Sequence, residues 1–192
     1  MRVVGISGTP RKGGNTEYLV KECLKEFAKQ GWTVSECLLS EKTIKPCNGC
    51  DSCVDSGVCV ITDDDAETLF ANLIDCDAVI IGSPVYYRNV TAQLKALFDR
   101  NYPYGYKTLE GKPGGAIAVG RGEGAGQAST LMIIYNFILS SGGLPVPGEL
   151  NGLSARADKP GEIMTQERRL NQARILAKNV IKYAEKLRGN ER

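Results

Sequence analysis

The chain alternates short apolar, β-branched runs with longer stretches of helical periodicity, and this alternation restricts it to few folds. The run DAVIIGSP at 77–84 is apolar almost throughout, which is typical of a parallel strand covered by helices on both faces. Further strands are predicted at 2–7, 32–39 and 114–120. This pattern predicts a parallel sheet between two layers of helices. Because crossovers between parallel strands are right-handed, few topologies remain.

The fifth predicted strand, LPVPGEL at 144–150, differs from the other four. Pro145 and Pro147 alternate in it, so one side lacks hydrogen-bond donors, which suits an edge strand. Residues 151–161 are predicted to form a loop. The chain thus belongs to the α/β class. Its pattern matches a flavodoxin-like three-layer sandwich with a five-stranded parallel sheet, order 2-1-3-4-5, better than a six-stranded dinucleotide-binding fold.

One domain is predicted over residues 1–192, because hydrophobic residues make up 42% and charged residues 24% of the chain, as in globular proteins that bury a core. A cysteine-rich insertion is expected at 43–62, after the second strand, and an amphipathic C-terminal helix at 163–188. The other helices are predicted at 15–30, after the acidic residues 63–65 up to about 74, at 91–100 and at 128–141.

Charge and composition argue against several classes of function. The formal net charge is +2, too small to indicate nucleic-acid or membrane binding. No apolar run reaches the ~18 residues of a membrane span, and strand-like sequence from Arg2 leaves no room for a signal peptide, so a cytoplasmic location is expected. There is no histidine, so a cofactor is expected to carry any redox or transfer chemistry.

The turn SGTPRKGGNT at 7–16 lies between a predicted strand and a predicted helix. Its glycines allow close approach of the backbone, and hydroxyls at Ser7, Thr9 and Thr16 can donate to phosphate oxygens. Arg11, with Lys12 as a further candidate, adds positive charge beside the helix N-terminus. The turn lacks the Lys-Ser/Thr ending of a P-loop. It predicts a phosphate site, with a flexible polar turn as the alternative.

Two more loops should reach the same edge of the sheet. GSPVYYRN at 82–89 combines a proline turn with adjacent tyrosines, which could form a wall for a planar ring; an ordinary aromatic pair is the alternative. VGRGEGAGQ at 119–127 is glycine-rich, and from Gly120 onward its backbone could contact a ligand. Together the three loops predict a phosphate site and a ring site on one rim.

Four cysteines lie within thirteen residues, in the spacing C-x2-C-x2-C-x5-C. Iron–sulfur clusters take four thiolates, often three of them in C-x2-C-x2-C spacing. Zinc is the competing metal, although structural zinc sites more often use two separated C-x2-C pairs, and unmetallated redox or buried thiols are the third reading. The cluster is the favoured one. Its predicted ligands are Cys47, Cys50, Cys53 and Cys59, whereas Cys23, Cys37 and Cys76 are predicted to be buried.

The segments GISGTPRKGGNT and GSPVYYRNVTAQLKALFDR resemble the NAD(P)H-dependent FMN reductase group of flavodoxin-like proteins, and the resemblance covers nearly the whole chain. The phosphate loop of that group usually has Ser where this chain has Thr9, which keeps the hydroxyl. The resemblance implies that the FMN phosphate is held by Ser7, Thr9, Arg11, Asn15 and Thr16. It implies that the isoalloxazine is lined by Pro84, Val85, Tyr86, Tyr87 and Asn89, with looser matches around Gly120.

An FMN fold with this cysteine motif resembles the iron–sulfur flavoproteins of anaerobic microbes, which carry FMN and a [4Fe-4S] cluster. The resemblance implies electron transfer between one-electron partners such as ferredoxin and two-electron partners such as NAD(P)H, in a homodimer or homotetramer. Two alternatives stay open. One is an NAD(P)H-dependent FMN or quinone reductase without a cluster, and the other is a non-enzymatic binding module in which the cysteine loop is a structural clip.

Overall fold

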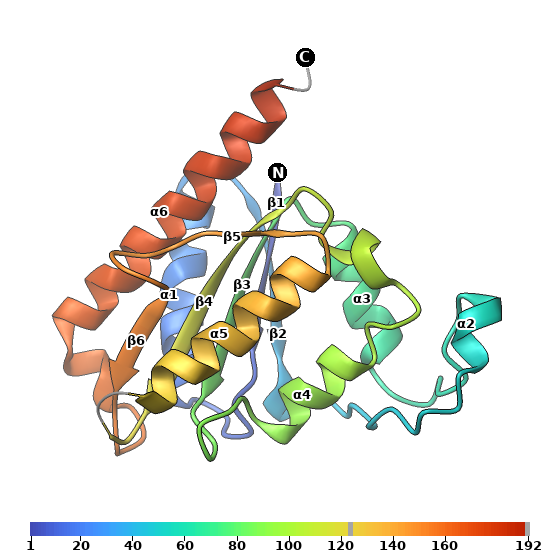
Figure 1. Cartoon of the computed structure of the whole chain (residues 1–192). Coiled ribbons are helices and arrows are strands. Elements are labelled where there is room, and N and C mark those ends of the chain that lie inside the picture. Colours follow the sequence, from blue (N-terminus) through green and yellow to red (C-terminus); the bar gives the residue numbers. More distant parts are fainter. Residues whose placement is uncertain (123–124, 191–192) are drawn as a thin grey trace.

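The structure is a computed structural model that describes residues 1–122 and 125–190. A twisted sheet lies at its centre with helices on both sides (Figure 1). The strands are β1 (Arg2–Ser7), β2 (Thr33–Leu38), β3 (Ala78–Pro84), β4 (Pro113–Gly120), β5 (Leu144–Pro145) and β6 (Leu153–Arg156). The α-helices are α1 (Asn15–Lys29), α2 (Ser52–Ser56), α3 (Ala66–Ile74), α4 (Ala92–Asp99), α5 (Ala125–Ser140) and α6 (Glu167–Asn190). Three short 3-10 helices are η1 (Leu39–Glu41), η2 (Gly105–Thr108) and η3 (Glu162–Thr165).

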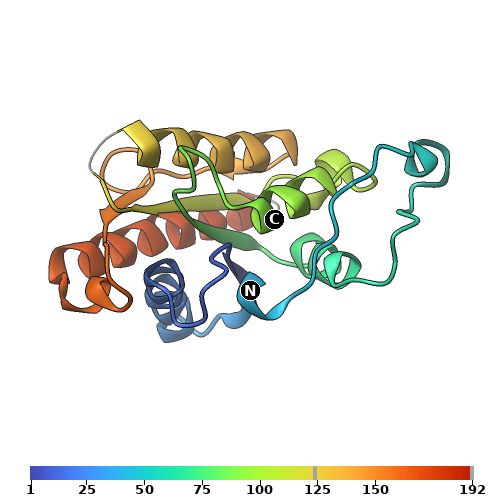
Figure 2. The ribbon, with the colours of Figure 1, turned by 90° about the horizontal axis from the view of Figure 1, so that it is seen from below.

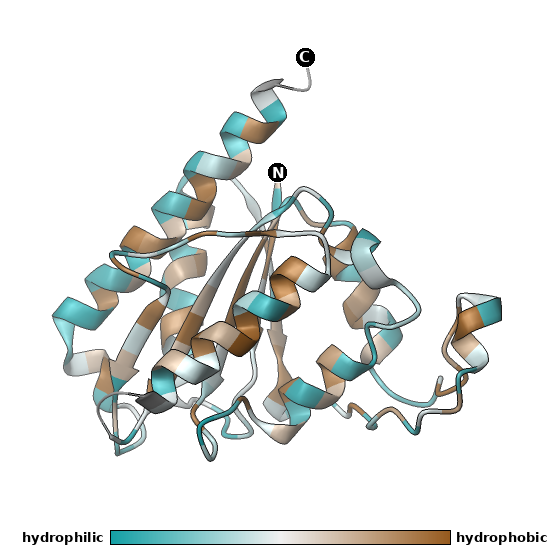
Figure 3. Ribbon diagram, viewed as in Figure 1, coloured by the Kyte–Doolittle hydropathy of each residue, from teal (hydrophilic) through white to brown (hydrophobic). Residues whose placement is uncertain are grey.

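The strand order is β2-β1-β3-β4-β5, which confirms the predicted flavodoxin-like topology. Every pair of these strands is parallel. The central strands β3 and β4 are buried along nearly their whole length, whereas β2 at the edge is largely half-exposed. Figure 3 shows the corresponding pattern, with hydrophobic residues concentrated on the central strands.

The fifth position in the sheet is shared by two segments. β5 pairs with the beginning of β4 over two residues only, and β6 pairs with Ile117–Gly120 at its end. The prediction of a loop at 151–161 was therefore wrong for Leu153–Arg156, where buried and exposed residues alternate as in a strand. The ladder from the first segment to β4 ends at Val146, because the next N–H on that side, that of Gly148, donates to the Asn151 carbonyl instead. The chain then makes a short excursion before it rejoins the sheet.

Two hydrophobic clusters fill the space on the two faces of the sheet. α1 and α6 pack on one face through residues such as Leu24, Phe27 and Leu176. α3, α4 and α5 cover the other face through residues such as Phe70 and Leu97. Figures 1 and 2 show these two layers from perpendicular directions. Among the described residues no helix has the length and apolar character needed to cross a bilayer.

Helix α1 lies unusually close to the central strands, because glycines face it. A Cβ atom added at Gly82 would lie 2.7 Å from Cγ2 of Val20 and 2.9 Å from Cγ2 of Thr16. At Gly5, an added Cβ would lie 2.6 Å from Cδ1 of Leu24. This close approach sets the position of the N-terminus of α1 at the carboxyl edge of the sheet.

The cysteine-rich segment leaves the sheet after β2 and η1 and returns to it at α3. It projects away from the body, with the short helix α2 at its far end (Figures 1 and 2). Helix α2 was not predicted from the sequence; it has only five residues and lies between Asp51 and Gly57, both of which have positive φ.

We predict that Gly82→Ala destabilises the chain by about 1–3 kcal/mol, because the added methyl overfills the contact with α1. Gly189→Ala is the matched control, since an added Cβ there meets no atom within 4 Å; it should be neutral or stabilising by up to ~1 kcal/mol. Urea unfolding followed by circular dichroism measures both. Equal stability of the two variants would contradict the packing described here.

Candidate functional site

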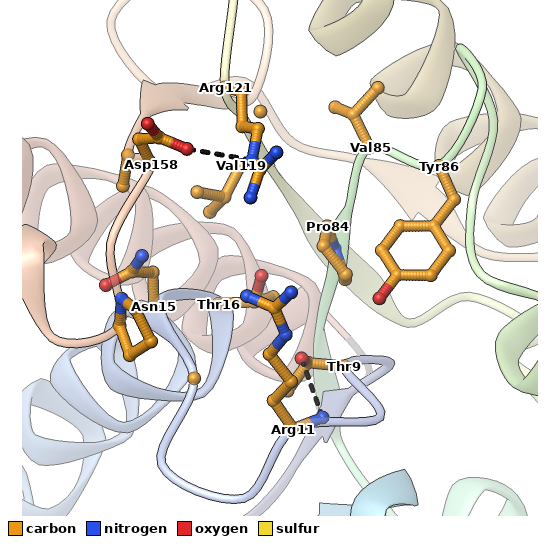
Figure 4. Close-up of a pocket in the computed structure, with 14 residues that line it drawn as sticks. Thr9, Arg11, Asn15, Thr16, Pro84, Val85, Tyr86, Val119, Arg121 and Asp158 are labelled. Atoms are coloured by element: carbon orange, nitrogen blue, oxygen red, sulfur yellow. Dashed lines mark hydrogen bonds and ion pairs between the residues drawn. The ribbon is translucent and has the colours of Figure 1, made fainter.

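A pocket opens at the carboxyl edge of the sheet, among the loops that follow β1, β3, β4 and β6 (Figure 4). Its volume is about 270 Å³, near the lower limit for pockets that enclose small ligands, so an elongated ligand would extend beyond it. Most of the predicted binding residues line this pocket: Thr9, Arg11, Asn15, Thr16, Pro84, Val85, Tyr86 and Gly120.

The first wall comes from the β1–α1 loop and the start of α1. Thr9 and Thr16 are buried there, and Oγ1 of Thr9 accepts a hydrogen bond from the Arg11 N–H at 3.2 Å. Figure 4 shows the Arg11 guanidinium pointing into the pocket near Thr16. The N-cap of α1 is Gly14, which offers no side-chain cap. The first N–H groups of the helix therefore lack a side-chain acceptor, which is the arrangement that binds phosphate.

Ser7 lies at the end of β1, completely buried, and its Oγ has no hydrogen-bond partner within the described part of the chain. It does not line the pocket. Buried hydroxyls are normally paired, so an unpaired one directly beneath this loop indicates that a polar group belongs nearby. Together with the uncapped helix and Arg11, this residue fits an anionic phosphate.

Two charged residues, Lys12 of the first loop and Glu17 of α1, hold the loop in its conformation. Lys12 forms an ion pair with Glu41 of η1 at 2.7 Å and does not line the pocket. Glu17 accepts a hydrogen bond from the Gly13 N–H at 2.8 Å and pairs with Lys21. Gly13 has φ +65°, a conformation that other residues seldom adopt. Glu17 thus holds the turn in its compact form.

Asn15 lines the pocket, but its side chain is occupied. Its Nδ2 donates to the carbonyl of Lys159 at 2.8 Å, and its Oδ1 accepts from the Ile163 N–H at 3.2 Å. Asn15 therefore fixes the segment between β6 and η3 against the start of α1. That segment adds Ala157, Asp158 and Pro160 to the pocket wall.

The second wall comes from the β3–α4 loop. Pro84, Val85 and Tyr86 line the pocket, and the Val85 N–H donates to the Val119 carbonyl at 2.8 Å. Figure 4 shows the Tyr86 ring at the side of the pocket opposite Asn15. An apolar wall with one aromatic ring suits a flat ligand.

Tyr87 and Asn89 do not line the pocket. Tyr86 and Asn89 pair across a tight two-residue turn, in which Tyr87 and Arg88 have φ of 48° and 63°. The turn leaves the Tyr87 side chain fully exposed, and the Asn89 side chain accepts a hydrogen bond from the Val90 N–H. Two non-glycine residues with positive φ side by side are uncommon and concentrate at functional sites.

The third predicted loop contributes Val119, Gly120 and Arg121 to the pocket. Glu123 and Gly124 of the predicted VGRGEGAGQ segment lie outside the described residues. Arg121 forms an ion pair with Asp158 at 2.8 Å. Sequence reasoning missed Arg121 and the Ala157–Pro160 wall, and only recognition of β6 could have indicated that this segment returns to the carboxyl edge.

The four clustered cysteines are free thiols in the projecting loop; Cys47 and Cys50 are exposed, and Cys53 and Cys59 are partly buried. Two of the sulfurs have local donors. The Gly49 N–H donates to Sγ of Cys47 at 3.4 Å. Hydrogen bonds from the Ser52 hydroxyl and the Ser52 backbone lower the pKa of the Cys50 thiol. Donors directed at sulfur favour thiolates, the form that binds metals.

In residues 1–122 and 125–190, no three cysteine, aspartate or glutamate side chains lie close enough together to hold a metal ion. The donor chemistry of the loop therefore fits a thiolate-bound group, while its sulfurs are not gathered around one point. Cys23, Cys37 and Cys76 are buried, as predicted. Burial raises the pKa of Cys37 to about 12 and that of Cys76 to about 11, so these thiols stay neutral.

Known proteins share this architecture. Residues 1–154 match the family described as NADPH-dependent FMN reductase. An iron-sulfur flavoprotein of Methanocaldococcus jannaschii is 39% identical over 186 residues, which cover 94% of this chain and 95% of that protein. An iron-sulfur flavoprotein of Archaeoglobus fulgidus is 40% identical over 85% of this chain and 72% of its own length. The solved NAD(P)H:quinone oxidoreductase of Methanothermobacter marburgensis has a TM-score of 0.72 at 17% identity and covers 94% of this chain and 98% of its own.

The chain therefore belongs to the NADPH-dependent FMN reductase family and, within it, to the iron–sulfur flavoproteins. It is a flavin-dependent oxidoreductase, and FMN is its flavin. The uncapped helix, the unpaired Ser7 hydroxyl and Arg11 fit the phosphate of that cofactor.

We predict that Asn15→Ala releases the segment 157–163 from α1, because both hydrogen bonds of the Asn15 amide are lost. Hydrogen–deuterium exchange at the Ile163 amide should become about tenfold faster or more, as expected for losing 1–2 kcal/mol of local stability. The control is Asn72→Ala, which removes a hydrogen bond within α3 only. An unchanged exchange rate at Ile163 would refute this role for Asn15.

Proposed function

We propose that this chain is an electron-transfer iron–sulfur flavoprotein, with FMN in the pocket and a [4Fe-4S] cluster held by Cys47, Cys50, Cys53 and Cys59. One observation carries the proposal: the pocket lies at the carboxyl edge of the sheet, and the cysteine loop starts from the same edge, after β2 and η1. The chain also belongs to the family of iron–sulfur flavoproteins. The Lys12–Glu41 ion pair joins the loop around the pocket to η1, from which the cysteine loop departs.

The FMN phosphate is assigned to the start of α1. Its uncapped N–H groups, the Thr9 and Thr16 hydroxyls and the Arg11 guanidinium offer donors and positive charge in one place. The unpaired Ser7 hydroxyl lies at the start of the same loop but outside the pocket lining, and it is the remaining candidate donor. Asn15 contributes chiefly by fixing the wall that includes Asp158, since its amide is already hydrogen-bonded.

The isoalloxazine is assigned to the wall formed by Pro84, Val85 and Tyr86, with the backbone at Gly120 on the other side. Tyr87 and Asn89 belong to the tight turn that holds Tyr86 in place. The exposed Tyr87 ring at its tip is available to a partner that approaches the flavin from solvent.

FMN exchanges two electrons and an iron–sulfur cluster exchanges one, so the pair would link two-electron donors such as NAD(P)H to one-electron carriers such as ferredoxin. The chain itself binds and orients these groups. It has no histidine, so protons would reach the flavin from water or other side chains. A homodimer or homotetramer is part of this proposal.

A second candidate is an NAD(P)H-dependent FMN or quinone reductase that carries no cluster. One observation favours it: the four sulfurs are not gathered around a common point within the described residues. The structural resemblance to an NAD(P)H:quinone oxidoreductase is compatible with both candidates, because it concerns the fold alone.

We predict that Cys53→Ala loses bound iron but retains FMN, because the thiol lies in the projecting loop and not in the pocket. Cys76→Ala, which alters a buried thiol outside the loop, should retain both. Iron, acid-labile sulfide and FMN are assayed in anaerobic preparations. Loss of FMN together with iron in Cys53→Ala would favour a structural clip instead.

We predict that Thr16→Val weakens FMN binding about tenfold or more, since a hydrogen bond to a charged phosphate is worth about 1.5–3 kcal/mol. Valine has nearly the shape of threonine, so the fold should persist. Thr33→Val, at an exposed position in β2, is the control. Fluorescence titration with FMN measures both, and equal affinities would argue against a phosphate beside Thr16.

A further inference from the structure

The cysteine loop is closed at its base by one arginine. Nη1 of Arg100 donates to the carbonyl of Lys45 at 3.0 Å, where the chain leaves the body. Nη2 of the same guanidinium donates to the carbonyl of Ile61 at 2.7 Å, where the chain returns. The four clustered cysteines all lie between these two carbonyls. Arg100 follows directly after α4, so it belongs to the body and not to the loop.

A buried carboxylate completes this base. Asp64 forms an ion pair with Arg100 at 2.7 Å, and the two side chains are 1% and 2% exposed. Asp64 also accepts hydrogen bonds from the Lys45 N–H at 2.8 Å and from the N–H of Ala66, the first residue of α3, at 3.0 Å. Burial acts to raise the pKa of Asp64, but these hydrogen bonds and the guanidinium outweigh it and lower the pKa. Asp64 therefore stays charged and holds Arg100 in place.

The Nε–H of Arg100 takes part in none of these hydrogen bonds. It is buried and has no hydrogen-bond partner in the part of the chain that the structure describes. Beside it lies a small cavity lined by Arg100, Cys59, Phe70 and Tyr104, among others. The Phe70 and Tyr104 rings stack at 4.7 Å. Cys59 is thus the clustered cysteine that lies against the body, next to an unpaired buried donor.

We propose that Arg100 is a positioning residue for the cysteine loop: its Nη groups clamp the two ends of the loop, and its Nε–H donates to the sulfur of Cys59. The clamp is a property of the chain itself. Its role toward a cluster rests on the function proposed above. Lysine could not replace Arg100, because the bonds to Lys45, Ile61 and Asp64 need several donors in one plane.

This arrangement has two separable consequences. Closing the base limits how far Cys59 can move away from the other three cysteines, and loss of such a supporting contact typically weakens metal binding 10- to 100-fold. A hydrogen bond to a ligand sulfur also stabilises the reduced form of a cluster, so its removal lowers the reduction potential. A purely structural arginine would affect the first property and leave the second unchanged.

The test compares Arg100→Lys and Asp64→Asn with Arg174→Lys, which alters a paired arginine on α6. In metal-free protein we expect hydrogen–deuterium exchange at residues 43–45 and 61–66 to be about tenfold faster or more in both Arg100→Lys and Asp64→Asn. In anaerobically loaded protein we expect iron transfer to a chelator to be about tenfold faster or more, at unchanged FMN content. Only Arg100→Lys should lower the reduction potential, because Asp64→Asn keeps the Nε–H.

Exchange at the base of the loop equal to that of Arg174→Lys would overturn the clamp. Faster iron loss with an unchanged potential in Arg100→Lys would overturn the bond to Cys59. If the unmodified chain binds no iron, the proposed function fails, while exchange in the metal-free protein still decides the clamp. If Arg100→Lys does not fold, the clamp is decided by Asp64→Asn. The bond to Cys59 is then decided by comparing Arg100→Gln with Arg100→Met: both remove the charge, but glutamine keeps an N–H group at the position of Nε, so equal reduction potentials would overturn the bond.

Discussion

The close packing of α1 on the central strands is the constraint on which the remaining arrangement depends. Glycines at positions 5 and 82 remove the side chains that would otherwise hold the helix away from the sheet. The first turn of α1 therefore lies directly beside the carboxyl ends of β1 and β3. This places uncapped N–H groups, two buried threonines and the apolar wall of the β3–α4 loop around one pocket. These are the groups to which the proposed function assigns the phosphate and the flat ring of FMN.

Much of this could be predicted from the sequence because the signals are local. The apolar run at 77–84 identifies a central strand, and the hydroxyl-rich turn at 7–16 indicates a loop that lines the pocket at the carboxyl edge of the sheet. The parts that were missed depend on contacts between distant segments. β6 is only four residues long, and the hydrogen bonds from Asn15 reach residues 159 and 163. Likewise, nothing near position 100 in the sequence indicates that its guanidinium closes a loop that begins at Lys45.

Two of the predicted ring-site residues, Tyr87 and Asn89, illustrate a different limit. Their types suit a flavin wall, but the chain turns tightly between Tyr86 and Asn89, so the next side chain points to solvent. In the cysteine loop, the sequence indicates which thiols belong together but not where they lie in space. Its spacing defines which thiols can act together, whereas their positions depend on how the loop is held at its base and on what binds inside it. The Arg100–Asp64 pair supplies the first of these conditions.

The central claim is that one edge of the sheet carries both a flavin and a thiolate-bound cluster. The most direct measurement is the ratio of iron, acid-labile sulfide and FMN in the 192-residue protein purified without exposure to oxygen. With one [4Fe-4S] cluster beside each flavin, iron and sulfide should be equal in amount, about four of each per FMN. Protein that binds FMN fully but contains neither iron nor sulfide would contradict it.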